Sequence, residues 1–87
     1  MRASVVIPTF NRLGDLQRVV ASLEAQAALD RSVEIVVVDD GSTDGTHEWL
    51  AQAAEAGRVA AVSQDNSGPA VARNRGVEAA TGDLVLF

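Results

Sequence analysis

The sequence contains no cysteine and no lysine, and each absence excludes a class of chemistry. Without cysteine there is no disulfide framework, no thiolate nucleophile and no cysteine-based zinc site. Without lysine there is no P-loop lysine for phosphates and no lysine that forms a Schiff base. No apolar run approaches the ~20 residues that span a membrane, and the first residues lack the apolar core of a signal peptide. We therefore predict a cytoplasmic protein without a transmembrane segment.

Basic residues are also scarce. The 87 residues carry 7 basic and 12 acidic side chains, which gives a net charge of −5. Nucleic-acid binding requires a basic face, so this charge argues against a nucleic-acid partner. Aromatic residues make up only 3% of the chain, so alanine and valine must supply most of the apolar core. A chain of this length forms one small domain, or part of one, with a thin core.

The most specific pattern lies in residues 34–44. It begins with Ile35 to Val38, four consecutive β-branched residues. Because this run does not alternate with polar residues, both of its faces must be buried, which is typical of a central parallel strand. Asp39 and Asp40 follow at its carboxyl end, where ligands bind in open α/β sheets. We predict that Asp39 binds backbone amides of the following turn and that Asp40 contacts a ligand, since an unpartnered buried carboxylate is costly.

Apolar runs and helical periodicities alternate along the rest of the chain. Strands separated by helices pair in parallel through right-handed crossovers. We therefore predict an α/β fold, with a Rossmann-like parallel sheet of about four strands and flanking helices. The predicted strands are residues 3–7, 33–39, 59–62 and 83–87, and the predicted helices begin near residues 13, 44 and 69 and end near residues 28, 56 and 81.

Several single residues have structural interpretations. Pro8 is expected to end the first strand. Asn11 and Asp44 are candidate N-caps of the first and second helices. Gly76 is interpreted as a site of close helix–sheet packing. His47 is a lone histidine on a surface helix, and nothing in the sequence positions it as a metal ligand or a base.

The sequence ends inside the fourth predicted strand, with no following helix to cover it. We expect residues 1–87 to be the N-terminal part of a larger domain. The uncovered strand is also a candidate for self-association, since exposed strand edges pair with other chains.

Three blocks of the sequence resemble those of glycosyltransferase family 2, whose domain has the GT-A fold. The blocks stand in the family's order and spacing, and together they cover the whole chain. The resemblance implies that residues 1–87 are the nucleotide-sugar-binding portion of such a domain. The blocks are Ser4 to Arg12, Glu34 to Thr46, and Asn66-x-Gly68-x-x-x-Ala72-Arg73-Asn74-x-Gly76 followed by Gly82-Asp83.

By this resemblance, six residues would form the nucleotide-sugar site. Residues after the first strand would line the base pocket, Asp40 would accept a hydrogen bond from the base, and Arg73 would lie near the diphosphate. A carboxylate acceptor fits the N3–H donor of a uracil-like base, which favours a UDP-sugar or dTDP-sugar. Phe10 replaces the tyrosine of many relatives, which keeps ring stacking but loses any hydroxyl contact. The six residues are Pro8, Thr9, Phe10, Asn11, Asp40 and Arg73.

The resemblance also implies chemistry that lies outside these residues. Such enzymes transfer a sugar to an acceptor hydroxyl with inversion, using a carboxylate base. They bind a divalent metal, Mg²⁺ or Mn²⁺, through a D-x-D motif that is expected just beyond Phe87. We therefore expect no catalytic residue and no metal ligand in the chain. We also expect no turnover by it alone, and weak nucleotide binding at best.

Two alternatives of other classes remain open. A phospho-acceptor receiver domain in signalling also has an acidic pair and alternating strands and helices. Its acids, however, follow the first strand and it requires a lysine, whereas here the pair follows the second strand and lysine is absent. The other alternative is a non-enzymatic remnant that pairs with another chain through its open strand.

Overall fold

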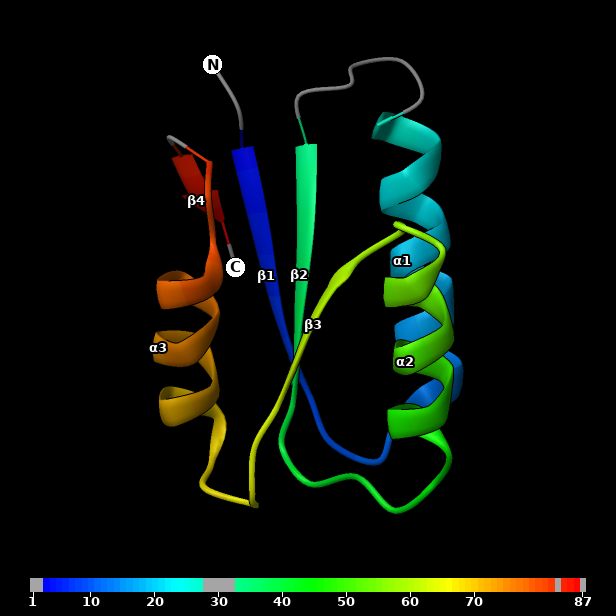
Figure 1. Ribbon diagram of the computed structural model, residues 1–87, viewed down its shortest axis with the longest axis vertical. Coiled ribbons are helices and arrows are strands. Elements are labelled where there is room, and N and C mark those ends of the chain that lie inside the picture. The colour runs from blue at the N-terminus through cyan, green and yellow to red at the C-terminus, as the bar shows by residue number, and fades with distance from the viewer. Residues whose placement is uncertain (1–2, 28–32, 83, 87) are drawn as a thin grey trace.

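The computed structural model describes residues 3–27, 33–82 and 84–86. Strands and helices alternate along the chain, as the sequence predicts (Figure 1). The predicted element ends at residues 28, 83 and 87 lie outside the described residues. The elements are β1 (Ala3–Thr9), α1 (Leu13–Ala27), β2 (Val33–Asp39), α2 (Thr46–Glu55), β3 (Ala60–Ser63), α3 (Pro69–Ala79) and β4 (Leu84–Leu86).

The strands form one parallel sheet in the order β3-β2-β1-β4, which confirms the predicted α/β fold. Helix α3 packs on one face of the sheet, and α1 and α2 cover the other (Figure 1). The register places Thr9 beside Asp39, and Asp39 beside Ser63. The carboxyl ends of β1, β2 and β3 therefore meet at one edge, and the loops that follow them lie together.

Strand β2 is buried on both faces, as its unbroken apolar run predicts. Ile35 and Val37 belong to the apolar cluster beneath α1 and α2, whereas Val38 lies near Gly76 of α3. Each residue from Ile35 to Val38 is 5% exposed or less. Full burial of such a side chain contributes roughly 1.5–3 kcal/mol, so this strand stabilises both helical layers.

Helix α3 lies closer to the sheet than an ordinary side chain allows. A Cβ atom built on Gly76 would lie 2.1 Å from Val6 Cγ1 and 3.2 Å from Val38 Cγ2. Ala72, one turn earlier in the helix, is fully buried as well. The interpretation of Gly76 as a site of close helix–sheet packing is confirmed.

Strand β1 continues through Pro8 to Thr9, so the prediction that Pro8 ends it is wrong. The Thr9 carbonyl accepts a hydrogen bond from the Asp40 amide, so the backbone polar groups of Thr9 face β2. Those of Pro8 face the opposite side, where β4 pairs only with Ala3 to Val5 in the described sheet. The missing N–H of Pro8 therefore removes no bond of this sheet, which is the condition under which strands tolerate proline.

Both predicted N-caps differ in the structure. Gly45, with φ at 96°, is the N-cap of α2, and the helix begins at Thr46 rather than at Asp44. Asp44 Oδ1 accepts a hydrogen bond from the Thr46 amide at 3.1 Å, and its Oδ2 accepts one from the Leu13 amide at 3.1 Å. Leu13 is the first residue of α1, so one carboxylate stabilises the starts of two helices. Asn11 does not cap α1, because its side chain bonds to the loop after β2.

A polar network at the amino end of the sheet was not anticipated from the sequence. Glu34 Oε1 accepts hydrogen bonds from Ser4 Oγ at 2.8 Å and from the Thr81 amide at 2.9 Å. Ser4 is fully buried, and its Oγ also accepts a hydrogen bond from the Gly82 amide at 2.8 Å. The network joins β1 and β2 to the segment that leads into β4, and it holds that segment beside β1.

The edge strands and the helices determine which partners the described fold could contact. Strands β3 and β4 are the two edges of the sheet, and α2 and α3 flank β3 (Figure 1). No helix within the described ranges is long and apolar enough to cross a bilayer.

Candidate functional site

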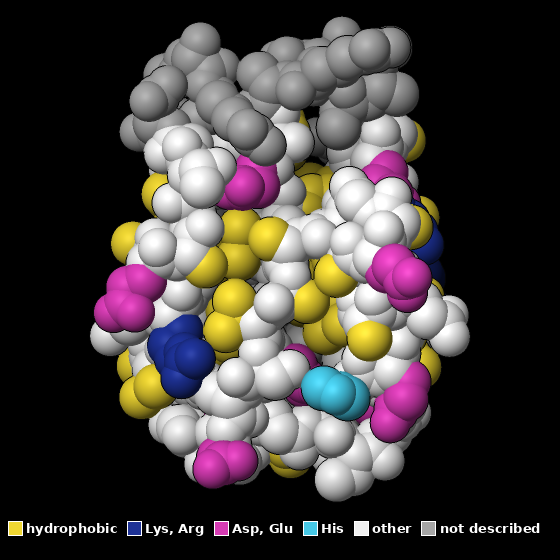
Figure 2. Space-filling view, viewed as in Figure 1, with side chains coloured by type: hydrophobic (Ala, Val, Ile, Leu, Met, Phe, Trp, Pro, Cys, Tyr) yellow, Lys and Arg dark blue, Asp and Glu magenta, His cyan; other side chains and the backbone are white. Residues whose placement is uncertain are grey.

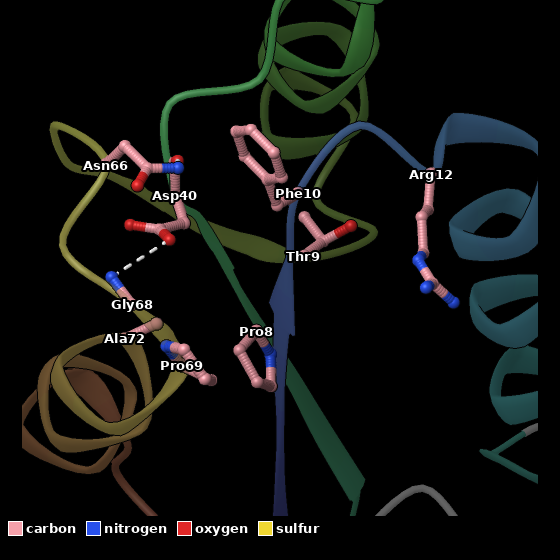
Figure 3. Close-up of a pocket in the computed structure, with 9 residues that line it drawn as sticks. All are labelled: Pro8, Thr9, Phe10, Arg12, Asp40, Asn66, Gly68, Pro69 and Ala72. Carbon is pink, nitrogen blue, oxygen red and sulfur yellow. Dashed lines mark hydrogen bonds between the residues drawn. The ribbon is translucent and has the colours of Figure 1, made fainter.

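A cavity of about 580 Å³ opens at the edge of the sheet where β1 and β2 end (Figure 3). Its walls come from the end of β1 with the loop after it, from the residue after β2, and from the start of α3 with the loop before it. Segments far apart in the sequence therefore enclose one space. The lining residues are Pro8, Thr9, Phe10, Arg12, Asp40, Asn66, Gly68, Pro69 and Ala72.

Four of the six residues predicted for the nucleotide-sugar site line this cavity: Pro8, Thr9, Phe10 and Asp40. The parallel register of β1 and β2 explains this, because both chains leave the sheet at the same edge. Phe10 is 45% exposed, so it is not a core residue. Its ring stands beside Asp40 in the cavity wall (Figure 3). The binding roles of these residues stay predictions.

Asn11 is not among the lining residues, and instead it joins two loops. Its φ is 50°, in the left-handed region that asparagine tolerates. Its backbone amide donates to Ser42 Oγ at 2.9 Å, and its side-chain Oδ1 accepts a hydrogen bond from the Thr43 backbone amide at 2.7 Å. Asn11 therefore holds the loop that carries Phe10 and Arg12 against the loop after β2.

The arginine that lines the cavity is not the predicted one. Arg73 lies on α3 with an exposed side chain, and it is not among the lining residues. Arg12 is among the lining residues, and Figure 3 shows its side chain on the α1 side of β1, across that strand from Asp40. No role was predicted for Arg12, although it ends the first block of the family resemblance. That position, directly after the first loop, is the signal that could have identified it.

Asp40 is bonded to the loop before α3 and is only 6% exposed. Its Oδ1 accepts hydrogen bonds from Gln64 Nε2 at 2.9 Å and from the Ser67 amide at 2.7 Å. Its Oδ2 accepts a hydrogen bond from the Gly68 amide at 3.1 Å. Because Gly68 is the N-cap of α3, this carboxylate from the end of β2 also stabilises the start of that helix.

These hydrogen bonds favour the ionised form of Asp40. The Gln64 side chain, and after it the Ser67 amide, lower the pKa of Asp40 below its ordinary value against the opposing effect of burial. The Thr46 side chain lowers the pKa of Asp44 in the same way. Both groups are therefore carboxylates at neutral pH, and Asp40 contributes negative charge to the cavity.

Asp39 has a structural role, as the sequence predicts. Its side chain is 2% exposed, and its Oδ1 accepts a hydrogen bond from the Ser42 amide at 3.0 Å. Successive side chains of a strand point to opposite faces, so the side chains of Asp39 and Asp40 lie on opposite faces of the sheet. Asp39 thus fixes the turn that follows β2.

A second cavity of about 440 Å³ lies on the Asp39 side, near the ends of β2 and β3. His47 and Arg75 contribute to its walls, and His47 Nδ1 lies 3.3 Å from Ser63 Oγ. Figure 2 shows the histidine on this face, next to the hydrophobic side chains that gather between α2 and α3. No ligand role for His47 or Arg75 was predicted. Within the described residues, no group of three histidine or acidic side chains is arranged to hold a metal ion.

Comparison with known sequences identifies one family. The family model for glycosyl transferase family 2 matches residues 4–87. The chain is 39% identical over 89 residues to the uncharacterized glycosyltransferase alr2836 of Nostoc sp.. It is 40% identical over 87 residues to the uncharacterized glycosyltransferase YibD of Escherichia coli. These alignments cover 100% and 99% of the chain but 27% and 25% of the relatives, so the chain spans about a quarter of their length.

Solved structures resemble the fold over its whole length. S. aureus TarS matches with a TM-score of 0.83 and 31% identity, covering 100% of the chain and 16% of TarS. Mannosyltransferase PcManGT from Pyrobaculum calidifontis, in complex with GDP-Man and Mn²⁺, matches with a TM-score of 0.77 and 31% identity, covering 97% and 26%. S. aureus TarS 1-349 in complex with UDP matches with a TM-score of 0.72 and 30% identity, covering 100% and 26%. The predicted resemblance is confirmed.

Proposed function

Since the chain belongs to glycosyl transferase family 2, we propose that residues 1–87 bind the nucleotide of a nucleotide-diphospho-sugar donor. The donor we propose is a UDP-sugar or a dTDP-sugar. A structural neighbour in complex with GDP-Man and Mn²⁺ supports the binding of a nucleotide-sugar, and a neighbour in complex with UDP supports the choice of a uracil nucleotide. The receiver-domain alternative is set aside, because the family match extends over residues 4–87.

The position of Asp40 beside Phe10 in one cavity carries the proposal (Figure 3). Within the described residues, Asp40 Oδ2 receives one hydrogen bond, from the Gly68 amide. A carboxylate oxygen accepts about two, so Oδ2 can accept a further N–H from a ligand. Uracil and thymine offer such a donor at N3, whereas N3 of cytosine is an acceptor. The exposed Phe10 ring offers a stacking face, which is worth roughly 1–3 kcal/mol per base.

Arg12 and Arg73 are the proposed partners of the diphosphate. A guanidinium is always charged and donates to two phosphate oxygens at once. Both arginines are exposed, but Arg12 lines the cavity, whereas Arg73 only follows the lining residue Ala72. We therefore propose Arg12 as the principal cation of the site and Arg73, which the family resemblance indicates, as a second one.

The substitution Arg12→Gln is expected to weaken UDP binding roughly three- to tenfold and to leave uridine binding unchanged, because only UDP carries the phosphates. NMR titration of the isotope-labelled chain measures both affinities, since chemical shifts report the weak binding expected of this chain. Arg73→Gln is the matched comparison, with the same loss of charge at a position that does not line the cavity, and a smaller effect is expected. A larger effect of Arg73→Gln, or an equal loss of uridine binding in Arg12→Gln, would refute the assignment.

The remaining chemistry is proposed for residues outside the described ranges. We propose that the whole enzyme transfers the sugar to an acceptor hydroxyl with inversion, and that this chain alone does not turn over. The divalent metal expected in the whole enzyme, Mg²⁺ or Mn²⁺, has no fitting group of ligands among the described residues. We assign its ligands, and the catalytic base, to other parts of the enzyme. A cytoplasmic location stays a prediction from the sequence.

A second candidate role is association through the edge strand β4. In the described sheet β4 pairs only with β1, and an open strand edge is a template for another chain. The chain is therefore expected to form dimers as its concentration rises, which sedimentation velocity over a wide concentration range would detect. A monomer at every concentration would exclude this role without affecting the nucleotide site.

A further inference from the structure

Gln64 directly follows β3 and bonds to both aspartates at the end of β2. Its backbone amide donates to the Asp39 carbonyl at 2.9 Å, which holds residue 64 beside that end of the strand. Its side-chain Nε2 donates to Asp40 Oδ1 at 2.9 Å. Gln64 is not among the residues that line the Asp40 cavity, so it acts on Asp40 from behind the cavity wall.

The hydrogen bonds make the two oxygens of Asp40 unlike. Oδ1 accepts from Gln64 Nε2 and from the Ser67 amide, which fills its acceptor capacity of about two bonds. Oδ2 accepts from the Gly68 amide only, within the described residues, so one acceptor position remains. Figure 3 shows the Gly68 bond to Oδ2, with the other oxygen directed away from Phe10. Of these three hydrogen bonds to the Asp40 carboxylate, the one from Gln64 comes from a side chain, and the other two come from backbone amides.

The orientation of the Gln64 side-chain amide favours the hydrogen bond to Asp40 over a hydrogen bond to its own Oε1. Its Oε1 is buried and has no hydrogen-bond partner among the residues that the structure describes, which is unfavourable for an acceptor. The opposite orientation would place Oε1 against Asp40 Oδ1, with two acceptors and no proton between them. The amide therefore donates to Asp40 although its own oxygen stays unpaired.

We propose that Gln64 is a positioning residue that sets the nucleobase specificity of the site, because by occupying Oδ1 it leaves Oδ2 as the single acceptor for the base. The inference rests on the proposed function of the cavity. A single acceptor in a fixed place selects a base with a ring N–H, as uracil has at N3. Cytosine meets Oδ2 with an acceptor at N3 and is disfavoured.

Loss of the Gln64 donor would change this selection. Oδ1 would be left with the Ser67 amide alone, so it could accept a second hydrogen bond. A less constrained carboxylate with two open positions can turn to accept from the exocyclic amine of cytosine. The preference for uracil over cytosine would then fall, while the affinity for the uracil nucleotide would change less.

The test compares Gln64→Met with Gln52→Met. Methionine keeps the unbranched shape of glutamine but has no N–H donor. Gln52 is exposed on α2, away from the cavity, and takes the same substitution. NMR titrations with UDP and with CDP give the ratio of the two dissociation constants for each protein. We expect the preference for UDP to fall roughly three- to tenfold in Gln64→Met, the effect of one hydrogen bond, and to stay unchanged in Gln52→Met.

A second readout separates positioning from a general loss of structure. A carboxyl-carbon NMR titration follows Asp40 directly. The pKa of Asp40 is expected to rise toward its ordinary value in Gln64→Met, since the Gln64 hydrogen bond is the largest cause of its lowering. In the unsubstituted chain, the Gln64 side-chain amide signals are expected to shift as Asp40 titrates. That measurement requires no variant, so it tests the Gln64–Asp40 hydrogen bond, on which the inference depends, even if Gln64→Met does not fold.

The outcomes that overturn the inference differ from those that overturn the proposed function. If the unsubstituted chain prefers UDP and Gln64→Met keeps the same preference and the same pKa of Asp40, the inference fails and the proposed function stands. If the Gln64 side-chain amide signals do not shift as Asp40 titrates, the inference also fails and the proposed function stands. If the unsubstituted chain binds neither nucleotide, the proposed function fails and the inference fails with it.

Discussion

Replacing Gly76 by alanine is expected to destabilise the fold by about 3 kcal/mol or more, as over-packing of a tight interface does. The added methyl group would lie 2.1 Å from Val6 Cγ1, well inside van der Waals contact. Val6 is 1% exposed and Val38 is 0% exposed, so neither side chain has free space to move into. A domain has only about 5–15 kcal/mol of stability, so this substitution removes a large share of it. Urea denaturation followed by circular dichroism measures the change.

Gly14→Ala is the matched control, because it adds the same methyl group to a different helix. Nothing lies within 4 Å of the position that a Cβ on Gly14 would take. Alanine is favoured over glycine inside a helix by up to about 1 kcal/mol, so this variant is expected to be at least as stable as the parent chain. If Gly76→Ala were also as stable as the parent chain, the close approach of α3 to β1 would be wrong.

The substitution Asp40→Asn is expected to weaken nucleoside binding roughly ten- to hundredfold, as the loss of a hydrogen bond to a charged acceptor does. Asparagine has the same size as aspartate, but only one of its two terminal side-chain atoms is an acceptor oxygen. Its NH₂ group would therefore face an N–H donor that bonds to the carboxylate in the unsubstituted chain. Either Ser67 or Gly68 then loses its acceptor. Uridine is the suitable probe, because it carries the base without phosphates. NMR titration measures its affinity.

The same variant is expected to reduce the loss of stability in acid. The pKa of Asp40 is lowered in the folded chain, first by the Gln64 side chain and then by the Ser67 amide, so the unfolded chain binds this proton more tightly. The contribution of Asp40 is fully present above the ordinary pKa of 3.8, and it is lost as the pH falls through the lower value of the folded state. Urea denaturation at neutral and at strongly acid pH should show a smaller difference for Asp40→Asn.

Asp65→Asn is the matched control for Asp40→Asn. Asp65 is an exposed acid in the loop that also contains Ser67, and it does not line the Asp40 cavity. Its replacement removes the same charge and is expected to change uridine affinity by no more than about twofold, as surface substitutions do. A folded Asp40→Asn chain that bound uridine as tightly as Asp65→Asn would remove Asp40 from the base-binding site.

The order of the elements, the central strand and the role of Asp39 could be predicted because they depend on neighbours in the sequence. Ile35 to Val38 form an apolar run without alternation, and such a run is stable only where both faces are covered. Asp39 bonds to Ser42, three residues later, within one turn. Patterns of this range are visible in the chain itself, and the structure confirms them.

Contacts between distant loops could not be predicted in this way. Asp44 was expected to cap the helix that follows it, yet its Oδ2 also bonds to Leu13, 31 residues earlier. Asn11 was expected to cap its own helix, yet its Oδ1 bonds to Thr43, 32 residues later. A polar side chain has the same local preference in either case. Its actual partner depends on how β1 and β2 pair, which brings the two loops together.

The sequence by itself determined the fold class, the family and the edge of the sheet at which the Asp40 cavity opens. Parallel strands align their carboxyl ends, so the residues after β1 and the two acids at the end of β2 had to meet there. Only the tertiary structure decided that Arg12 lines the cavity and that one oxygen of Asp40 is filled by Gln64 and Ser67. Those facts depend on side-chain directions and on hydrogen bonds between separate loops, and no periodicity along a chain encodes the distances that such bonds require.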